Sequence, residues 1–494
     1  MKKYQMYING AFFEGARKET LESINPSNEE VIASFPKASL EDAREAIDVA
    51  RLAFDKGEWP CLSHQERGQY LLKIAQAIRQ EAKALSQIES MSTGKTLKQT
   101  TFIDIPTCAS TFEYFAFVAS ELKGETIPVP APALSLTQRE PTGVVASIIP
   151  WNYPLIMFAW KIAPALACGN TVVLKPSQFG CLSILELTAL IDKIGLPKGV
   201  VNVITGDGKE LGPELAANPK VDMISFTGST NVGKEIMRLA SNNTKKIHLE
   251  LGGKSPNIVF ADCDLEAALG GAMSAIFMNQ GQMCTAGSRL LIEESIHDKF
   301  LKCLIEKTKR LKIGNSLDYT TDFGPLISRE HRQNVLKFIE TGVKEKASLV
   351  CGGKIPSAEQ FKKGFYLEPT IFANVENSMT IAQEEIFGPV LSVIKFTSVE
   401  EAIKIANDTK YGLAAMVWTK DLNKANMVAK KLQVGTVWIN TYGGFYNEAP
   451  FGGYKQSGIG RELGKEGLWE YTQLKHINLD LTEGGKSLVT TWFG

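Results

Sequence analysis

The sequence has no excess of charge of either sign, because 54 lysine and arginine residues balance 54 aspartate and glutamate residues. A strongly basic protein would be drawn to nucleic acid or to an anionic membrane, so this balance argues against both partners. A small molecule is the partner that the composition favours. With 494 residues, 44% of them apolar and 22% charged, the chain is expected to fold into two or three globular domains.

Long hydrophobic runs and paired cysteines are also missing. The most apolar stretch, residues 151–169, is interrupted by Pro154, Lys161 and Pro164, which argues against a membrane-spanning helix. The first fifteen residues reach the Asn9-Gly10 turn before any apolar run, unlike a signal peptide. Eight scattered cysteines form no CxxC pair and do not combine with the five histidines at metal-ligand spacing. We therefore predict a cytoplasmic protein with reduced thiols and no bound metal.

The apolar periodicity predicts an α/β protein. The first 35 residues read as two hairpins that turn near residues 9–10 and 25–28, and residues 40–54 and 64–85 have helical spacing. Short β-branched runs then alternate with helical segments, at residues 171–177, 201–206, 222–229, 246–253 and 257–260. This alternation is typical of a parallel sheet, whose ligands bind at the carboxyl ends of the strands. Those ends are Lys175, Gly206, Gly228 and Glu250, and a second α/β pattern follows at residues 253–451.

One cysteine has unusual neighbours. Cys284 lies in "NQGQMCTAGSR", residues 279–289, among amides, hydroxyls and glycines instead of aliphatic side chains. A cysteine can attack a carbonyl carbon where a polar site lowers its pKa or a base takes its proton. Gly281 and Gly287 allow close backbone approach, so the N–H group of Cys284 can face an oxyanion. The alternative is an inert thiol in a turn.

Three further segments favour a catalytic role. Asn152 lies in "PWNYP", where two prolines stiffen a loop that presents an amide donor, and Glu250 ends an apolar strand in "LELGGKSP". Gly228 and Gly233 follow a strand and open a helix, although their spacing is neither GxGxxG nor a Walker loop. Taken singly, each has an ordinary explanation as a turn, a paired carboxylate or a helix start.

Together these segments resemble the aldehyde dehydrogenase superfamily nearly from end to end. Further matching segments are "WKIAPALACGNTVVLKPS", "EEIFGPV" and "FGGYKQSGIGRE", in the family's order. The resemblance implies two doubly wound α/β domains and a small β oligomerisation arm. It places the dinucleotide-binding domain at residues 1–121 and 139–252, the catalytic domain at 253–451, and the arm at 122–138 and 472–494. It also implies a homodimer or homotetramer.

The resemblance assigns roles to five residues. Cys284 resembles the nucleophile that adds to the aldehyde, and Asn152 with the Cys284 N–H group resembles the oxyanion hole. The adduct then passes hydride to the nicotinamide and becomes a thioester, which Glu250 hydrolyses by activating water. Lys161 and Glu462 match positions that hold or relay protons around Glu250.

The resemblance also implies an NAD or NADP site. Its residues match Ile149, Trp151, Lys175, Ser177, Gln178, Gly208, Gly212, Phe226, Gly228, Ser229, Val232, Leu251, Glu385 and Phe387. Gln178 departs from the pattern, since NAD-restricted members usually have a glutamate that repels the 2′-phosphate of NADP. We therefore predict that NADP is accepted beside NAD. The alternative is that Gln178 merely hydrogen-bonds the ribose.

The matched substrate tunnel is uncharged and rich in aromatic residues and methionine. It consists of Tyr153, Met157, Trp160, Met278, Met283, Phe445 and Phe451. Such a lining predicts broad oxidation of apolar aliphatic, aromatic or isoprenoid (retinal-like) aldehydes.

Betaine aldehyde or amino aldehyde oxidation is the alternative, because Tyr153 and Trp160 also match part of an aromatic cage for cations. That cage has Met278 in place of an aromatic residue, Phe451 in place of a tryptophan, and only Asp104 of several aspartates at the tunnel mouth. Two further alternatives are a coenzyme A-acylating enzyme and a catalytically silent binding protein. Retention of Glu250, Cys284 and Asn152 argues against both.

Overall fold

The structure is a computed structural model that describes residues 2–485, 487 and 489–493. Strands β2 (Met6–Ile8) and β3 (Ala11–Phe13) form a hairpin in which Asn9 and Gly10 have φ values of 55° and 75°. The next pair, β4 (Thr20–Ile24) and β5 (Val31–Pro36), is also antiparallel, and β1 (Lys2–Lys3) lies parallel to β5. The two predicted hairpins are therefore confirmed.

An eight-stranded sheet forms the first large layer, in the order β22-β12-β11-β8-β9-β10-β2-β3. Its five central strands are mutually parallel and nearly all their residues are buried. Burial on both faces explains why these strands read as continuous apolar runs instead of alternating patterns. Their bounds are β8 (Val144–Ile149), β9 (Thr171–Pro176), β10 (Val201–Val203), β11 (Met223–Thr227) and β12 (Lys246–Glu250), with β22 (Gly458–Ile459) antiparallel to β12.

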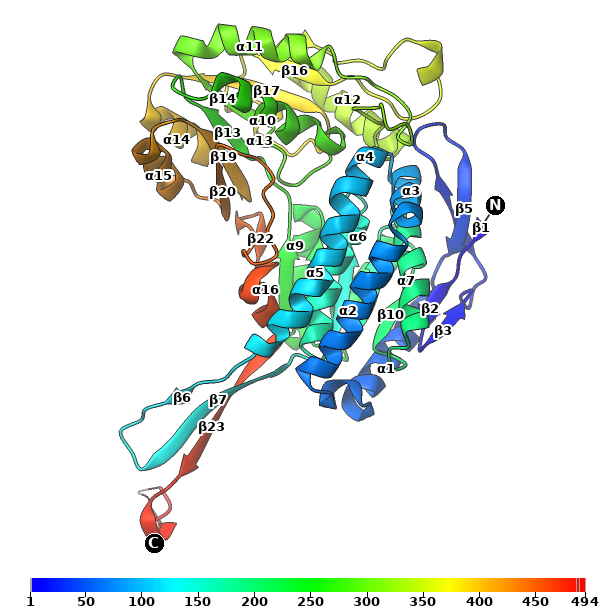
Figure 1. Cartoon of the computed structure of the whole chain (residues 1–494), viewed down its shortest axis with the longest axis vertical. Coiled ribbons are helices and arrows are strands. Elements are labelled where there is room, and N and C mark those ends of the chain that lie inside the picture. The colour runs from blue at the N-terminus through cyan, green and yellow to red at the C-terminus, as the bar shows by residue number, and fades with distance from the viewer. Residues whose placement is uncertain (1, 486, 488, 494) are drawn as a thin grey trace.

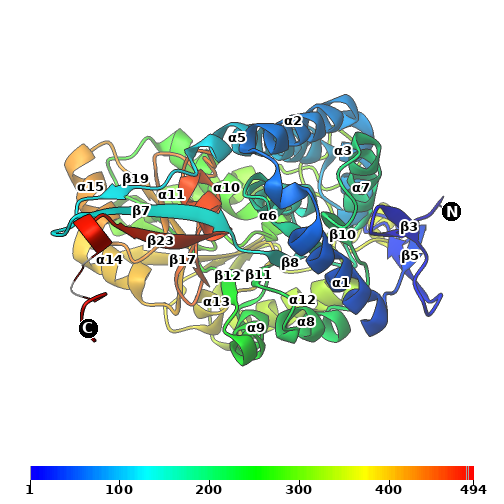
Figure 2. The ribbon, with the colours of Figure 1, turned by 90° about the horizontal axis from the view of Figure 1, so that it is seen from below.

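Helices cover both faces of this sheet (Figures 1 and 2). One face packs against α1 (Leu40–Lys56), α8 (Gly208–Ala217) and α9 (Thr230–Ala240). The other packs against α6 (Pro154–Ala167) and α7 (Leu182–Ile194), beneath α2 (His64–Gln80), α3 (Ala82–Thr93) and α5 (Ile105–Val118). The prediction of a single helix over residues 64–85 is wrong in one respect. The chain forms two helices there, α2 and α3, because Glu81 has a ψ of 18°, which lies outside the helical region. The apolar spacing continues across the break, so periodicity does not reveal it.

A seven-stranded sheet forms the second layer, in the order β15-β16-β17-β14-β13-β19-β20, with only β15 antiparallel to its neighbour. One face packs against α10 (Leu265–Phe277) and α11 (Glu294–Thr308), and the other against α12 (Arg329–Lys344), α14 (Val399–Asn407) and α15 (Leu422–Lys431). The strands are β13 (Pro256–Val259), β14 (Arg289–Glu293), β15 (Ser348–Cys351), β16 (Thr370–Ala373), β17 (Val390–Phe396), β19 (Ala414–Trp418) and β20 (Thr436–Ile439).

A three-stranded arm projects from the body (Figure 1). It consists of β6 (Thr126–Ile127), β7 (Ala133–Pro141) and β23 (Thr472–Asp480), and β7 pairs with β23 along nine residues of each strand. The short helix α16 (Gly464–Glu470) leads into β23. The segment 122–138, which the resemblance assigns to the arm, therefore contains β6 and most of β7, paired antiparallel. The domain boundaries drawn from the resemblance stay predictions.

No helix in the described part of the chain is long and apolar enough to cross a membrane. Within residues 2–485, 487 and 489–493, no group of three or more histidine, cysteine, aspartate or glutamate side chains is arranged to hold a metal ion. All eight cysteines are unpaired.

Candidate active site

The carboxyl ends of the parallel strands bring the predicted catalytic segments to one edge of the first sheet. Thr227 at the end of β11 pairs with Glu250 at the end of β12, and Phe226 pairs with Ile148 of β8. Asn152 lies in the loop just after β8, separated from it by Pro150 and Trp151, so it lies at the same edge as Glu250. This is the edge at which α/β sheets bind ligands.

The loop that carries Cys284 has a constrained backbone. Asn279, Gln280 and Gly281 have φ values of 46°, 55° and 72°, so three consecutive residues are left-handed. Two of them carry side chains, for which this conformation costs energy that the surrounding contacts must offset. Gln282 supplies two of these contacts, since its amide donates to the Asn279 carbonyl at 3.1 Å and its Oε1 accepts the Ile327 N–H at 3.0 Å.

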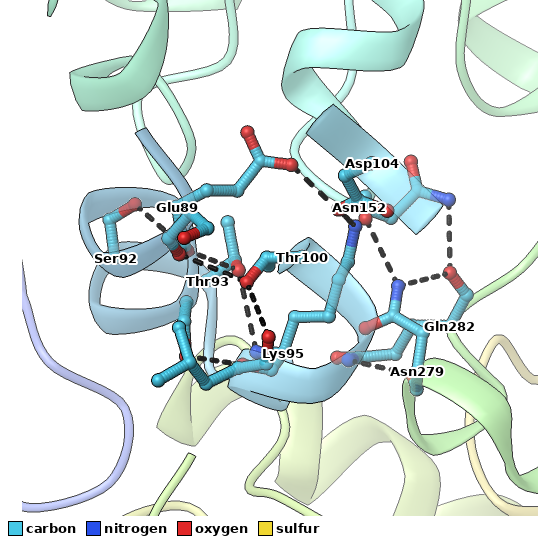
Figure 3. Close-up of polar contacts among 12 residues, drawn as sticks. Glu89, Ser92, Thr93, Lys95, Thr100, Asp104, Asn152, Asn279 and Gln282 are labelled. Atoms are coloured by element: carbon cyan, nitrogen blue, oxygen red, sulfur yellow. Dashed lines mark hydrogen bonds and ion pairs between the residues drawn. The ribbon is translucent and has the colours of Figure 1, made fainter. Parts of the chain in front are cut away.

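Asn152 is fixed to the same loop (Figure 3). Its side-chain amide donates to the Gln282 carbonyl at 2.9 Å, and its own carbonyl accepts from the Asn279 amide at 3.0 Å. One amide hydrogen of Asn152 is used in this way, and a second remains for another acceptor. The predicted oxyanion donor and the cysteine loop therefore form one rigid unit.

Cys284 lies where two cavities meet. The first cavity, of about 610 Å³, is lined by Asn152 and Cys284, and the second, of about 360 Å³, by Glu250 and Cys284. Both cavities are also lined by Tyr153, Met157 and Thr227. The thiol is thus reachable from both sides and adjoins the predicted oxyanion donor on one side and the predicted base on the other.

The surroundings of Cys284 do not lower its pKa. Burial, followed by the negative charges of Glu385 and Glu250, raises the pKa of the thiol to about 12, although the N–H groups of Thr285 and Cys284 act in the opposite direction. The polar loop therefore does not generate a thiolate, and a base has to take the proton.

Glu250 is the candidate base for the hydrolytic water. Its carboxyl group is 4% exposed, and neither oxygen has a hydrogen-bond partner among the residues that the structure describes. Burial and the neighbouring Glu462 charge raise its pKa well above the ordinary value, against the opposing effect of Lys161 and Arg461. A raised pKa moves a carboxyl group toward the range in which it takes up and returns a proton near neutral pH.

Lys161 and Glu462 form a buried ion pair behind Glu250. The Lys161 ammonium lies 2.7 Å from Glu462 Oε1 and donates to the Ser225 hydroxyl at 3.1 Å. Burial raises the pKa of Glu462, and Lys161 opposes that rise. The structure therefore brings the predicted pair together.

The first cavity collects part of the predicted cofactor set. Glu385 accepts the Gly253 N–H at 3.0 Å, and burial raises the pKa of its carboxyl to about 7. Gly252 leaves room for that carboxyl, since a Cβ there would lie 2.2 Å from Glu385 Oε2. The predicted residues that line the cavity are Trp151, Gly228, Ser229, Leu251, Glu385 and Phe387.

The other predicted cofactor residues do not line this cavity. They lie at the ends of β8 and β9, in β11, and at the starts of α8 and α9, and are Ile149, Lys175, Ser177, Gln178, Gly208, Gly212, Phe226 and Val232. Lys175 is close to Gly208, where a Cβ would lie 3.8 Å from Lys175 Nζ, and burial lowers the pKa of Lys175 to about 8. Phe226 supports the glycine turn, because its ring leaves no room for a side chain at Gly228.

Sequence reasoning missed several residues of the first cavity, above all His331 on α12. Its ring centroid lies 5.4 Å from that of Trp151, and its Nε2 lies 2.7 Å from the Phe387 carbonyl. The segment around His331 reads as an ordinary amphipathic helix, so no local signal could have found it. Other unpredicted lining residues are Pro150, Thr227, Gly252, Asn334, Lys337, Phe338, Thr341 and Ile386.

The second cavity is lined by all seven predicted substrate residues. The ring centroids of Trp160, Phe445 and Phe451 lie 5.3–5.9 Å apart. Of the described residues that line the cavity, Glu250 alone is charged. Lining residues that were not predicted are Ile103, Thr107, Ile156, Ser274, Thr285, Tyr442 and Gly443.

Asp104 does not lie at the mouth of this cavity, contrary to the expectation. It is fully buried and its Oδ2 lies 2.5 Å from the Lys95 ammonium, with Glu89 3.7 Å from the same ammonium (Figure 3). Lys95 in turn lies 3.6 Å from the centroid of the Tyr153 ring. The Asp104 carboxylate is thus used inside the protein, beneath the cavity wall.

Comparison with known proteins agrees with this geometry. The sequence matches the aldehyde dehydrogenase family over residues 12–477. It is 50% identical to the betaine aldehyde dehydrogenase of Bacillus subtilis (strain 168) over 99% of both chains, and 44% identical to retinal dehydrogenase 2 of Gallus gallus over 98% and 93%. A solved structure of betaine aldehyde dehydrogenase from Staphylococcus aureus, in complex with NAD+, has a TM-score of 0.97 at 45% identity and covers 99% of this chain and 97% of that one.

These matches confirm the predicted fold class and the predicted enzyme class. They favour the betaine aldehyde alternative over the main prediction of apolar substrates, since the betaine aldehyde relative is the more similar of the two. The chain belongs to the aldehyde dehydrogenase family.

Proposed function

We propose that this enzyme oxidises betaine aldehyde, or another small aldehyde with a cationic nitrogen near the carbonyl, to the carboxylic acid with NAD. The relatives named as betaine aldehyde dehydrogenases support this substrate class. Oxidation of hexanal-like or retinal-like aldehydes becomes the second candidate, supported by the apolar lining of the second cavity and by the retinal dehydrogenase relatives.

The second cavity supports a small cationic substrate. Five aromatic rings line it, those of Tyr153, Trp160, Tyr442, Phe445 and Phe451. Aromatic faces attract a quaternary ammonium through cation–π interaction, most strongly where water is excluded. A volume of about 360 Å³ lies near the lower end of the range for small-molecule sites, which suits a compact aldehyde better than an isoprenoid chain.

The observation that carries the proposal is the position of Cys284 between the two cavities. A substrate in the aromatic cavity presents its carbonyl carbon to Sγ, while the Asn152 amide and the Cys284 N–H group are available to the carbonyl oxygen. Sγ forms a bond to that carbon as its proton leaves to solvent water, so the Glu250 carboxylate stays free for the later hydrolysis. The product of this step is a thiohemiacetal oxyanion on Cys284, to which the Asn152 amide and the Cys284 N–H group donate.

Oxidation of the thiohemiacetal to the thioester is the chemistry that NAD supplies when bound. The thioester is then hydrolysed: Glu250 takes a proton from a water molecule, the resulting hydroxide adds to the carbonyl carbon, and the bond to Sγ breaks. The leaving sulfur takes up the proton from Glu250, which restores the thiol and the carboxylate. Asn152 again donates to the oxygen on which charge develops. The Lys161–Glu462 pair stands behind Glu250 and holds protons near it.

The residues of the first cavity fit a dinucleotide. Gly228 admits only a hydrogen at the turn before α9, and Ser229 caps that helix by accepting the Val232 N–H, so the other free N–H groups of the first turn are available to an anion. Lys175 is a buried cation near Gly208 at the start of α8. Glu385 offers a carboxylate to sugar hydroxyls. We therefore assign NAD binding to this side of Cys284.

We also propose that NADP is accepted beside NAD. Gln178 follows β9, near Lys175, and its side chain makes no hydrogen bond to the part of the chain that is described. A neutral amide there does not repel a 2′-phosphate as a glutamate would. Measuring kcat/KM for both cofactors tests this, and a preference for NAD beyond about 10³-fold, about 4 kcal/mol, would refute it.

The arm supports a homo-oligomer, dimer or tetramer. Strand β23 is an edge strand, and Leu474, Ile477 and Leu479 on it are exposed. An exposed edge with apolar side chains is a surface that a second copy covers. The unpaired cysteines are in keeping with a reducing, cytoplasmic compartment. Light scattering on the purified protein tests the assembly, and a monomer at micromolar concentration would exclude it.

The substrate is tested with a matched pair. Betaine aldehyde and 3,3-dimethylbutanal have the same shape and differ in the charge of one atom, nitrogen against carbon. We expect the higher kcat/KM for betaine aldehyde, and an equal or higher value for the neutral isostere would refute cation recognition. Hexanal and a retinal-like aldehyde complete the panel, and product analysis with and without coenzyme A distinguishes hydrolysis from acyl transfer.

A further inference from the structure

A buried histidine faces Glu250 and lies outside the predicted site. His248 is on β12 two residues before Glu250, so both side chains point to the same face of the sheet. The imidazole is fully buried, its Nε2 lies 3.5 Å from Glu250 Oε1, and its Nδ1 lies 3.2 Å from the Ser225 hydroxyl. Among the described residues, neither Nε2 nor either oxygen of Glu250 has a hydrogen-bond partner.

The hydrogen bonds around Ser225 assign the tautomer of His248. Lys161 can only donate, so the Ser225 oxygen accepts from it at 3.1 Å. The buried Tyr471 hydroxyl lies 3.1 Å from the same oxygen. Its hydrogen has no other acceptor among the described residues, so we infer that it donates to Ser225. Ser225 has then accepted two hydrogen bonds, and its own hydrogen is left for Nδ1. A neutral imidazole that accepts at Nδ1 carries its hydrogen on Nε2, on the side of Glu250.

Cations around the ring keep it neutral. Burial, and then the positive charges of Lys161, Lys246 and Arg461, hold the pKa of His248 well below its usual value. Lys161 comes from α6, Lys246 from the same strand, and Arg461 from the segment after β22. The ring therefore acts as a neutral donor and not as a positive partner.

Three carboxyl groups face the ring, and only one is free to accept from it. Glu462 Oε1 lies 3.8 Å from Nδ1 and is paired with Lys161. Glu470 of α16 approaches the ring across Gly460 and is paired with Lys246. Glu250 has no such partner among the residues described by the structure. To close the 3.5 Å separation to an ordinary hydrogen bond, Glu250 would have to break no hydrogen bond to any residue that the structure describes.

We propose that His248 is a positioning residue for Glu250. Its Nε2–H group donates a hydrogen bond to the ionised Glu250 carboxylate and holds that carboxylate in position to take a proton from the hydrolytic water. This inference rests on the proposed role of Glu250 as the base. A hydrogen bond to the charged form lowers the pKa of a carboxyl group and opposes the effect of burial. Without His248, Glu250 stays protonated to higher pH and the thioester is hydrolysed more slowly, while acylation of Cys284 is unaffected.

Hydrolysis of p-nitrophenyl acetate in the absence of cofactor separates these steps. The burst of nitrophenolate reports acylation of Cys284, and the steady rate reports hydrolysis of the acyl-enzyme. For His248→Leu we expect an unchanged burst, a steady rate at neutral pH about tenfold lower, and an acid limb of the steady rate moved up by about one pH unit. His248→Gln keeps an N–H donor and should restore most of the steady rate.

Two further variants make the result decisive. In a Glu250→Gln background, His248→Leu should cause no further loss, because the two residues act through one group. A Glu250→Gln variant with an unchanged steady rate would overturn the role of Glu250 itself. If Glu250→Gln slows hydrolysis but folded His248→Leu keeps the wild-type acid limb, the role of His248 is overturned instead. If His248→Leu does not fold, His248→Met serves as a second apolar replacement, for which we expect the same burst, steady rate and acid limb.

Discussion

Replacement of Phe451 tests the aromatic cavity as a site for cations. Its side chain is 5% exposed, and its ring centroid lies 5.5 Å from that of Trp160 and 5.3 Å from that of Phe445. In Phe451→Leu one aromatic face is lost while an apolar wall remains. A desolvated cation–π contact contributes about 0.5–2 kcal/mol, which corresponds to about 2- to 30-fold in kcat/KM.

The prediction concerns the kcat/KM of the cationic substrate divided by that of its neutral isostere. In Phe451→Leu we expect the kcat/KM of betaine aldehyde relative to 3,3-dimethylbutanal to fall by about 2- to 30-fold, because both substrates lose the same packing but only one loses the cation–π contact. Phe451→Trp should raise the ratio, since tryptophan binds cations most strongly. Initial rates of NADH formation give both constants, and thermal unfolding controls for stability. A ratio that stays constant in both variants would refute the reasoning.

Three other residues give separate predictions. Lys161→Met should lower the free energy of unfolding by about 3–5 kcal/mol, measured with denaturant, because it leaves Glu462 buried without its cation. Adding Glu462→Gln should recover part of the loss, and an unchanged midpoint of the unfolding transition in Lys161→Met would contradict this. The pKa of Lys175 near 8 means that its charge is lost as pH rises through that value, so the KM for NAD should increase above about pH 8 in the wild type and not in Lys175→Arg. With a pKa of about 12, Cys284 should be alkylated by iodoacetamide about tenfold faster for each pH unit between about pH 7 and about pH 10. Peptide mapping measures this rate, and an alkylation rate that reaches a plateau near pH 8 would contradict the effect of burial on the pKa.

The sheets and the central site residues were predictable because their signals are local. Fully buried parallel strands such as β9 and β11 consist of continuous β-branched and apolar residues, so their positions follow from the sequence. Gly228 directly follows β11 and Glu250 is the last residue of β12, and the parallel pairing of these strands places both residues at one edge without further information. The break between α2 and α3 at Glu81 was not predictable, since the apolar faces of the two helices have continuous spacing.

Contacts between distant segments account for what was missed. His331 lies 180 residues from Trp151 in sequence (331 minus 151), and only the approach of α12 to the loop after β8 brings them together. Asp104 was expected at a tunnel mouth, but its fit to Lys95 inside the protein depends on how α5 packs. His248 looks like one polar residue in a strand, and its importance follows from the residues of α6 and β11 that surround it.

Intact-protein mass spectrometry of the Glu250→Gln variant tests the covalent role of Cys284 most directly. After mixing with NAD and betaine aldehyde and a rapid acid quench, we predict a mass increase equal to one acyl group, located by peptide mapping on Cys284. The same treatment of Cys284→Ser should give no increase and no NADH. Absence of the adduct on Cys284, together with NADH formation by Cys284→Ser, would contradict covalent catalysis by this residue.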